Sequence, residues 1–452
     1  MSSPTGRPAL RRDRAFRAIW AGQTASLFGD QVTGLALPWL ILLQTRSPLA
    51  AGVIAALRYV PLVALGLVAG VAADHVSRHA LMIASDAGRA LALGAVAVLG
   101  LLRLAPPLWA LALVVLALGT GQLFFQIAYR AWLPEVTGEA RLARATAALE
   151  ASDAASVLVG YPLAGALIAA VGPVLALGAD ALSYVVSALT LGWAGNGERG
   201  GRGGARREKS ERTRRTRRTR EEREGGKPEG GTAGDAGDAG DAEDAEDAED
   251  RGALDEALAG VRLILRTPAQ RVLKGAGAAL YLDAGATGVL LATLTQLRLH
   301  LPATLAGVIF GAAGVGGLIG SALAPRLYER GWRRELGGAL AVAALGAMGL
   351  AVAGLLAPAP GFALAFAANL TLDGAVALGF VLTGTANTLV TPPELRGRVN
   401  AASTIYSSAV RGVAAIGAGA LAAAGDPLPA FLALAGCCLV ASGIAWGRRA
   451  GA

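Results

Sequence analysis

Apolar stretches of about twenty residues alternate with short polar stretches along most of the chain. This length spans the roughly 30 Å hydrocarbon core of a bilayer as a helix. Because lipid offers backbone groups no hydrogen-bond partner, each stretch is predicted to be helical. The predicted spans are residues 18–43, 48–72, 80–102, 107–129, 146–170, 173–194, 271–296, 304–327, 337–357, 361–389, 401–424 and 429–447. The pattern predicts an all-α polytopic membrane protein with 12 transmembrane helices.

One long polar segment divides these spans into two sets of six. Residues 195–252 begin with an Arg/Thr/Glu tract and end with the acidic repeat GDAGDAGDAEDAEDAED. Neither block has enough apolar residues to build a core, so the segment is predicted to be a disordered linker. We interpret this segment as a tether between the two sets of spans. The alternative is that its arginines bind lipid headgroups. Residues 253–268 have apolar positions at helical spacing and predict an amphipathic helix on the membrane surface.

The linker separates two predicted bundles, residues 18–194 and 271–447, with tails at 1–17 and 448–452. Short echoes relate the bundles: GDQVTG in the first span resembles DAGATG in the seventh. Likewise Pro134-Glu135 and Pro393-Glu394 are each followed by arginines. Two related sets of six spans are typical of a duplicated transporter.

Basic residues are distributed unevenly between the two sets of loops. The tails and the even-numbered loops carry most arginines, whereas the odd-numbered loops carry only Arg46, Arg103 and Arg298. The positive-inside rule therefore places both termini and the linker in the cytoplasm. The Ala/Gly/Arg-rich composition suggests a bacterial source, and hence an inner (cell) membrane location.

Composition argues against several other classes of function. The chain is 54% hydrophobic with a net charge of +8, but its basic residues lie in short loops without interleaved aromatic residues, which argues against nucleic-acid binding. Cys437 and Cys438 lie in an apolar stretch, and no histidine shares metal-ligand spacing with them, so neither a metal nor a cofactor is expected. No nucleophile–base pair or phosphate loop appears in the spans, which argues against an enzyme.

Ionisable residues inside spans are costly and usually face a partner or a cavity. Asp30 lies about 18 Å into the first span, and Arg58 lies at similar depth, about 15 Å from the opposite side. The two are predicted to form an ion pair between adjacent helices. That pair is interpreted either as part of the transport site or as a lock between the helices.

Further charged and amide residues are candidates for coupling or cargo binding. Asp283 is the seventh-span counterpart of Asp30, and it could carry a proton because its one nearby cation, Lys274, lies closer to the cytoplasm. Asp373 and Arg411 are both mid-span and could pair. Asp86 and Arg89 lie three apart on one helix face and are interpreted as a gate or a packing pair. Gln122 and Gln126 could orient a cargo molecule.

The loop after the second span carries a recognisable motif. In GVAADHVSRHALM, the residues Gly70, Asp74 and Arg78 occupy the places of the loop signature of the major facilitator superfamily, which this chain resembles. His75 and His79 stand where basic residues are usual, and Ser77 stands where a second glycine is usual. The resemblance implies that this cluster acts as a conformational gate, latching the outward-open state.

Other stretches resemble the branch of that superfamily that contains macrolide-efflux proteins and the enterobactin exporter, among them LPEVTGEARLARATAALEAS and PPELRGRVNAA. VGYPLAG, with Gly160, Pro162 and Gly165, resembles the fifth-helix motif of antiporters, although Tyr161 replaces the usual glycine before the proline. The resemblance implies a monomeric exporter of an amphipathic small molecule, working by alternating access on a proton gradient. The alternatives are an importer or facilitator of a polar metabolite, and a non-transporting membrane sensor.

Overall fold

The computed structural model describes residues 14–66, 76–194, 262–423 and 426–447, and within these ranges every regular element is a helix. Eleven of the described helices are long and apolar enough to cross a membrane. These findings confirm the predicted all-α polytopic fold. The linker, both extreme tails, residues 253–261 and two residues of the loop signature, Gly70 and Asp74, lie outside the described residues.

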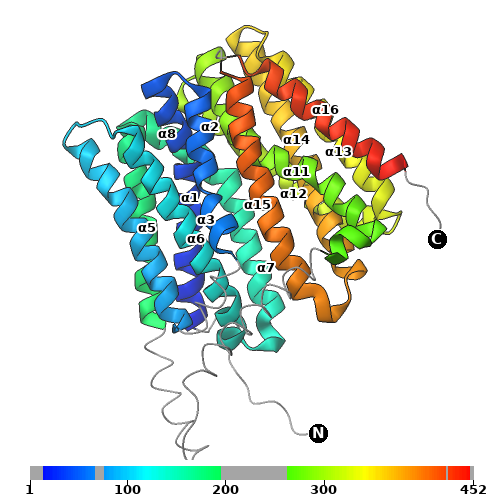
Figure 1. Cartoon of the computed structure of the whole chain (residues 1–452). Coiled ribbons are helices and arrows are strands. Elements are labelled where there is room, and N and C mark those ends of the chain that lie inside the picture. The colour runs from blue at the N-terminus through cyan, green and yellow to red at the C-terminus, as the bar shows by residue number, and fades with distance from the viewer. Residues whose placement is uncertain (1–13, 67–75, 195–261, 424–425, 448–452) are drawn as a thin grey trace, which may run out of the picture.

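Six helical segments precede the linker and six follow it within the described ranges (Figure 1). The first six are α1 (Arg14–Thr45), α2 (Pro48–Leu57) with α3 (Val60–Leu65), α5 (Arg78–Leu101), α6 (Leu108–Thr137), α7 (Glu139–Ala155) with η2 (Ser156–Gly160) and α8 (Tyr161–Val171), and the Pro173–Ala194 helix. The second six are α11 (Pro268–Thr293) with η3 (Leu294–Arg298), α12 (Ala303–Tyr328), α13 (Trp332–Ala353), α14 (Pro358–Val390), α15 (Arg396–Leu421) and α16 (Leu428–Gly447). We call these sets the N-half and the C-half.

The helix α15 is the one member of the C-half that is not apolar enough to count among the eleven candidate spans. Its first turns carry arginines, Asn400 and several hydroxyl residues, and Arg411 lies further along it. It nevertheless packs along α11 and α2 (Figure 1). Its polar residues Asn400, Ser403, Thr404 and Ser407 line a hollow of the C-half, which accounts for part of the polarity of this helix.

The second predicted span is not one continuous helix. It breaks into α2 and α3 at Arg58 and Tyr59. Pro61 explains the break, because its ring nitrogen has no hydrogen to donate to the carbonyl one turn earlier. An added Cβ at Gly119 of α6 would lie 3.2 Å from the Cα of Arg58. The absence of a side chain at Gly119 therefore lets the backbone at the break pack closely against α6. The part of the prediction beyond Gly66 lies outside the described residues.

The fifth span is also irregular. A π-helical turn, η2, separates α7 from α8, and Pro162 follows directly after it. Wide turns of this kind are single-turn insertions that bend a helix and are frequent at functional sites. The bend lies at the contact with the C-half, because η2 packs against α12.

The two halves touch closely along two helix pairs. An added Cβ at Gly165 of α8 would lie 3.2 Å from the Cα of Gly307 in α12. Similarly, an added Cβ at Gly419 of α15 would lie 3.0 Å from the Cα of Leu49 in α2. Small residues allow helices to approach this closely in membranes. We call the end of the bundle that contains Thr45, Pro48 and Leu421 the closed end.

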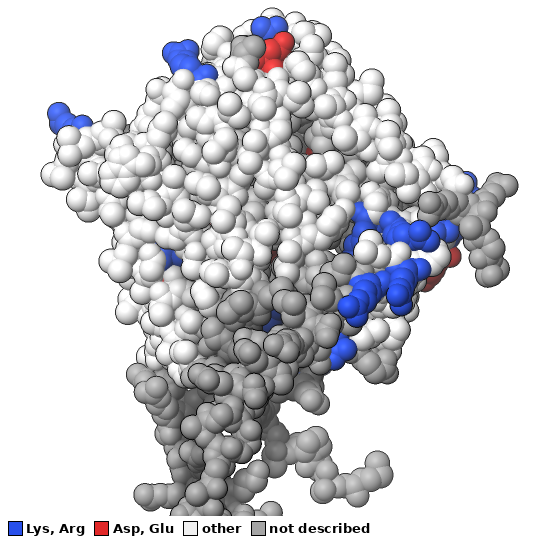
Figure 2. All heavy atoms as spheres, in the orientation of Figure 1, with Lys and Arg blue, Asp and Glu red and all other residues white. Residues whose placement is uncertain are grey.

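The opposite end, which we call the linker end, is where the Pro173–Ala194 helix finishes and α11 begins. Charged side chains visible in Figure 2 gather toward the two ends, and the surface between them is mostly uncharged. A mostly uncharged belt between charged ends is what a chain of spanning helices presents to lipid.

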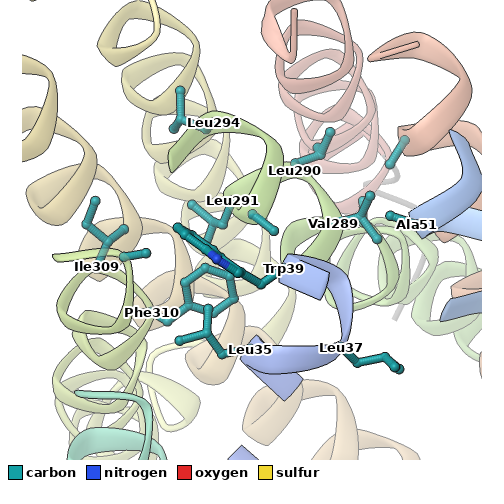
Figure 3. Packing of buried hydrophobic residues seen from close by; sticks show 14 of the residues in the cluster. Leu35, Leu37, Trp39, Ala51, Val289, Leu290, Leu291, Leu294, Ile309 and Phe310 are labelled. Carbon is teal, nitrogen blue, oxygen red and sulfur yellow. The ribbon is translucent and has the colours of Figure 1, made fainter. Parts of the chain in front are cut away.

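Buried apolar side chains join the halves near the closed end. Trp39 of α1 lies beside Leu291 of α11 and Phe310 of α12 (Figure 3). The Gln296 side chain of the C-half donates to the carbonyl of Trp39 at 3.3 Å. This packing closes the space between the halves at that end and leaves the hollows described below nearer the linker end.

Candidate functional site

A hollow of about 480 Å³ lies within the N-half, toward the linker end. Its walls come from α1, α5, α6 and α7. It is lined by Gln23, Ser26, Leu27, Asp30, Arg89, Gln122, Phe125, Gln126, Tyr129, Arg130, Leu133, Pro134, Leu142, Thr146, Leu149, Glu150 and Asp153. We call it the N-hollow. It combines apolar side chains with three carboxylates.

Arg89 of α5 organises the inner wall of the N-hollow. Its guanidinium pairs with the Asp86 carboxylate one turn earlier and donates to the Gln122 side-chain oxygen at 2.9 Å. It also lies over the Tyr184 ring, 4.2 Å from the centroid, a favourable cation–π distance. Asp86 and Arg89, predicted to lie on one helix face, thus form an ion pair buried in the N-half. The role of this pair as a gate stays a prediction.

Asp30 does not pair with Arg58 as we predicted. Its carboxylate accepts a hydrogen bond from the Tyr184 hydroxyl, and Arg58 interacts with it electrostatically without forming an ion pair within 4.0 Å. The break between α2 and α3 explains the difference, because it places Arg58 in a separate hollow of about 150 Å³ that also involves α11. The predicted pair was based on the equal depth of the two residues, which assumes that the second span is one straight helix.

A second carboxylate of the N-half is held by hydroxyl groups. Asp180 accepts hydrogen bonds from Thr33 of α1 and from Ser183 of its own helix. Its side chain is fully buried, so these donors supply the partners that water would otherwise provide. This carboxylate therefore ties the Pro173–Ala194 helix to α1.

The C-half has its own hollow of about 260 Å³, which we call the C-hollow. Lys274 of α11 lies on its wall and donates to the Ser403 hydroxyl at 2.6 Å and to the Asn387 side-chain oxygen at 3.4 Å. Arg130 of α6 lines this hollow as well as the N-hollow. The two hollows therefore meet at Arg130, between the halves.

Asp283 of α11 is buried and accepts a hydrogen bond at 2.9 Å from Thr287, one turn further along the helix. Asp373 of α14 is close enough for the two carboxylates to interact electrostatically. Among the described residues, neither forms an ion pair within 4.0 Å. The suggested Asp373–Arg411 pair is therefore wrong: Arg411 lies instead over the Tyr281 ring, 5.5 Å from its centroid.

The described part of the loop signature lies at the start of α5. Ser77 caps this helix by accepting a hydrogen bond from the Ala80 amide at 3.3 Å, which explains how a serine replaces the second glycine of the motif. Arg78 reaches the carbonyl of Ala131 at 3.5 Å, within the N-half. Its predicted gating role with Gly70 and Asp74 stays a prediction.

The fifth-helix motif lies at the contact between the halves. Pro162 packs against Gly311 of α12, and Gly165 packs against Gly307. An added Cβ at Gly160 would lie 3.1 Å from the Cβ of Gln31 in α1. The motif thus faces both the C-half and the first helix of its own half.

Gln122 and Gln126 both line the N-hollow as candidates for cargo binding. Sequence analysis missed Tyr184, which contacts both Asp30 and Arg89. A signal was available, because Asp180, Ser183, Tyr184 and Ser187 recur at helical spacing in an otherwise apolar span. A polar stripe of that kind predicts a face turned toward the protein interior.

Two sets of spanning helices around polar hollows near their contact define a membrane transporter of small molecules. The family model described as the Major Facilitator Superfamily matches residues 19–415, and the chain belongs to that superfamily. Both findings confirm the resemblance seen in the sequence.

Relatives and solved structures agree with this family. The chain is 32% identical to the multidrug efflux pump Tap of Mycolicibacterium fortuitum over 181 residues, 39% of this chain and 43% of the relative. The match thus spans less than half of the relative's length. A bacterial homologue of the iron transporter ferroportin in its inward-facing state superimposes with a TM-score of 0.68 at 16% identity, covering 98% of this chain and 100% of that one. Its outward-facing structure gives 0.55 at 18% identity, with 96% and 100% covered.

Proposed function

We propose that this protein is a proton-coupled secondary transporter that exports an amphipathic small molecule with a cationic group across a bacterial inner membrane. The observation that carries this proposal is the N-hollow, where apolar side chains surround Asp30, Glu150 and Asp153. Among these three carboxylates and the described residues, no ion pair within 4.0 Å forms, so they are available to a cation of the cargo.

The chemistry of the walls supports an amphipathic cargo. Phe125, Tyr129 and Leu133 offer an apolar surface beside the carboxylates. The hydroxyl of Tyr129 is buried without a hydrogen-bond partner among the described residues, and Gln126 is exposed to the hollow. A few polar groups set in an apolar pocket are typical of small-molecule sites.

The contacts between the halves support alternating access. At the closed end the halves meet through glycine contacts and apolar packing, while the N-hollow and C-hollow lie toward the linker end. With both termini and the linker in the cytoplasm, as the arginine distribution predicts, these hollows face the cytoplasm. Cargo would enter from there, and opening of the closed end would release it outside.

Asp283 and Asp373 are our candidates for proton coupling. The two carboxylates interact electrostatically and form no ion pair within 4.0 Å with any described residue, so they are free to exchange a proton during transport. Both lie in the C-half, away from the N-hollow lining. Similarity to the multidrug efflux pump Tap favours export of drug-like molecules over import of a polar metabolite, which is the second candidate.

A susceptibility panel in an efflux-deficient bacterial host tests this proposal. Expression of the wild-type protein should raise resistance to at least one cationic amphipathic compound. Asp30→Asn should reduce that resistance at unchanged membrane levels. Everted vesicles accumulate exported molecules. Their uptake of the same compound should therefore be higher with the wild-type protein than with Asp30→Asn. If neither protein changes resistance to any compound, drug export is contradicted. Transport directed into the cell would favour the importer.

A further inference from the structure

Two cations from opposite halves line the same hollow. Lys274 of α11 and Arg130 of α6 both lie on the wall of the C-hollow, whose volume is about 260 Å³. The other polar side chains on its wall include Asn387, Asn400, Ser403 and Ser407. None of the residues that line this hollow is acidic, so it brings together two positive charges without a carboxylate.

Among the described residues, the partners of these two cations are neutral or absent. There, the Lys274 ammonium contacts only the Ser403 hydroxyl and the Asn387 amide oxygen. Arg130 is exposed, and no hydrogen bond or ion pair joins its side chain to any described residue. Inside a spanning helix an ammonium normally pairs with an acid, so Lys274 is an exception that calls for an explanation.

An anion between the cations would remove this imbalance. A carboxylate accepts charge-assisted hydrogen bonds from ammonium and guanidinium groups, which are stronger than bonds between neutral groups. Side-chain amides and hydroxyls nearby, at Asn387, Asn400 and Ser407, add neutral donors to such a group. The hollow thus has the donors of a carboxylate site.

We propose that Lys274 and Arg130 bind a carboxylate of the cargo, an inference that rests on the proposed function. Arg130 also lines the N-hollow, so a single molecule can reach both hollows. Its cationic group lies beside Asp30 and Asp153, and its anionic group lies beside Lys274. The cargo class is therefore an amphoteric amphipathic molecule, with opposite charges at its two ends.

A matched pair of dyes tests this assignment. The probes are a rhodamine with a free benzoate group and its methyl ester, which share the cationic ring system and differ in the carboxylate. Binding of each is measured by fluorescence polarisation to the purified full-length protein in nanodiscs. The wild-type protein should bind the free acid more tightly than the ester, by about tenfold for a hydrogen bond to a charged group.

Lys274→Met should lower that ratio of affinities about tenfold, toward one, and Lys274→Arg should restore most of it. Arg271→Met is the control, because Arg271 lies one turn away on the same helix, is exposed and does not line the hollow. This control should keep the wild-type ratio. An unchanged ratio in Lys274→Met overturns the assignment.

The remaining outcomes separate this inference from the proposed function. Equal wild-type affinity for the two dyes contradicts the carboxylate site and leaves cationic export standing. Failure to bind either dye contradicts both. Inorganic phosphate or chloride, added at constant ionic strength, should not displace the free acid. Displacement that depends on Lys274 would show a site for free inorganic anions and overturn the assignment to cargo.

Discussion

The N-half and the C-half handle buried charge in different ways. In the N-half, Asp86 pairs with Arg89, and Asp30 and Asp180 accept hydrogen bonds from hydroxyl groups. In the C-half, Asp283 and Asp373 interact electrostatically and form no ion pair within 4.0 Å with any described residue, and Lys274 contacts neutral oxygens. The buried charges behind the N-hollow therefore have partners, whereas Glu150 and Asp153 on its lining and the buried charges of the C-half form no ion pair within 4.0 Å among the described residues.

The difference suggests a division of labour. A compensated network fixes the shape of a binding wall, because each charge already has a partner that orients it. Uncompensated charges respond to an incoming proton or ion, since binding removes an electrostatic cost. The comparison assigns the cargo's cation to the N-half and the response to protons to the C-half.

Neutralising one carboxylate in each half should have unequal effects. Asp86→Asn leaves the Arg89 guanidinium, only 3% exposed, without its ion-pair partner. Loss of one partner of a buried pair costs about 3–5 kcal/mol, so the unfolding midpoint in detergent should fall strongly. A fall no larger than that of an exposed substitution such as Arg271→Met would contradict the compensated network.

The corresponding change in the C-half is Asp373→Asn. It removes one of two neighbouring carboxylates and leaves no cation unpaired. Stability should therefore stay within about 0.5 kcal/mol of the wild type or rise. The same thermal unfolding assay checks it, and a loss as large as that of Asp86→Asn would end the distinction between the halves.

The contact between the halves can be disturbed with a single methyl group. In Gly165→Ala the added Cβ meets the Ala303 carbonyl and the Cα of Gly307. Overpacking typically costs about 1–3 kcal/mol, and here it falls on the contact that closes one end. Dye export by vesicles should drop severalfold. Gly436→Ala is the control, because its Cβ would meet nothing within 4 Å. Equal export by both variants would show that this contact is not needed for transport.

The linker should have the smallest effect. Replacing residues 199–250 by a flexible spacer of equal length should change dye export less than about twofold, since the composition of this segment is too poor in apolar residues to build a core. Vesicle transport normalised to membrane protein level measures it. Loss of export at a normal level would assign the arginines of this segment a role at the membrane surface.

The spans were predictable because their apolar length is a direct requirement of the bilayer. Which charged side chains pair with each other was harder to predict from the sequence. Asp30 and Arg58 match in depth, but the break before Pro61 redirects Arg58, and Tyr184 takes its place at Asp30. Arg411 likewise lies over Tyr281 instead of pairing with Asp373. Depth along a helix can be counted from the sequence, whereas the direction of a side chain depends on kinks and neighbouring helices.

Proton movement in proteoliposomes tests the central claim most directly. A pH-sensitive dye in the lumen reports proton flux when the methyl-ester rhodamine is added outside. Wild-type protein should move protons in response to the rhodamine, and Asp283→Asn should not, whereas the control Asp426→Asn, at the closed end, should behave as wild type. Rhodamine binding by each preparation shows that it is folded. Proton flux that does not depend on the rhodamine, or that persists in Asp283→Asn, would contradict the account.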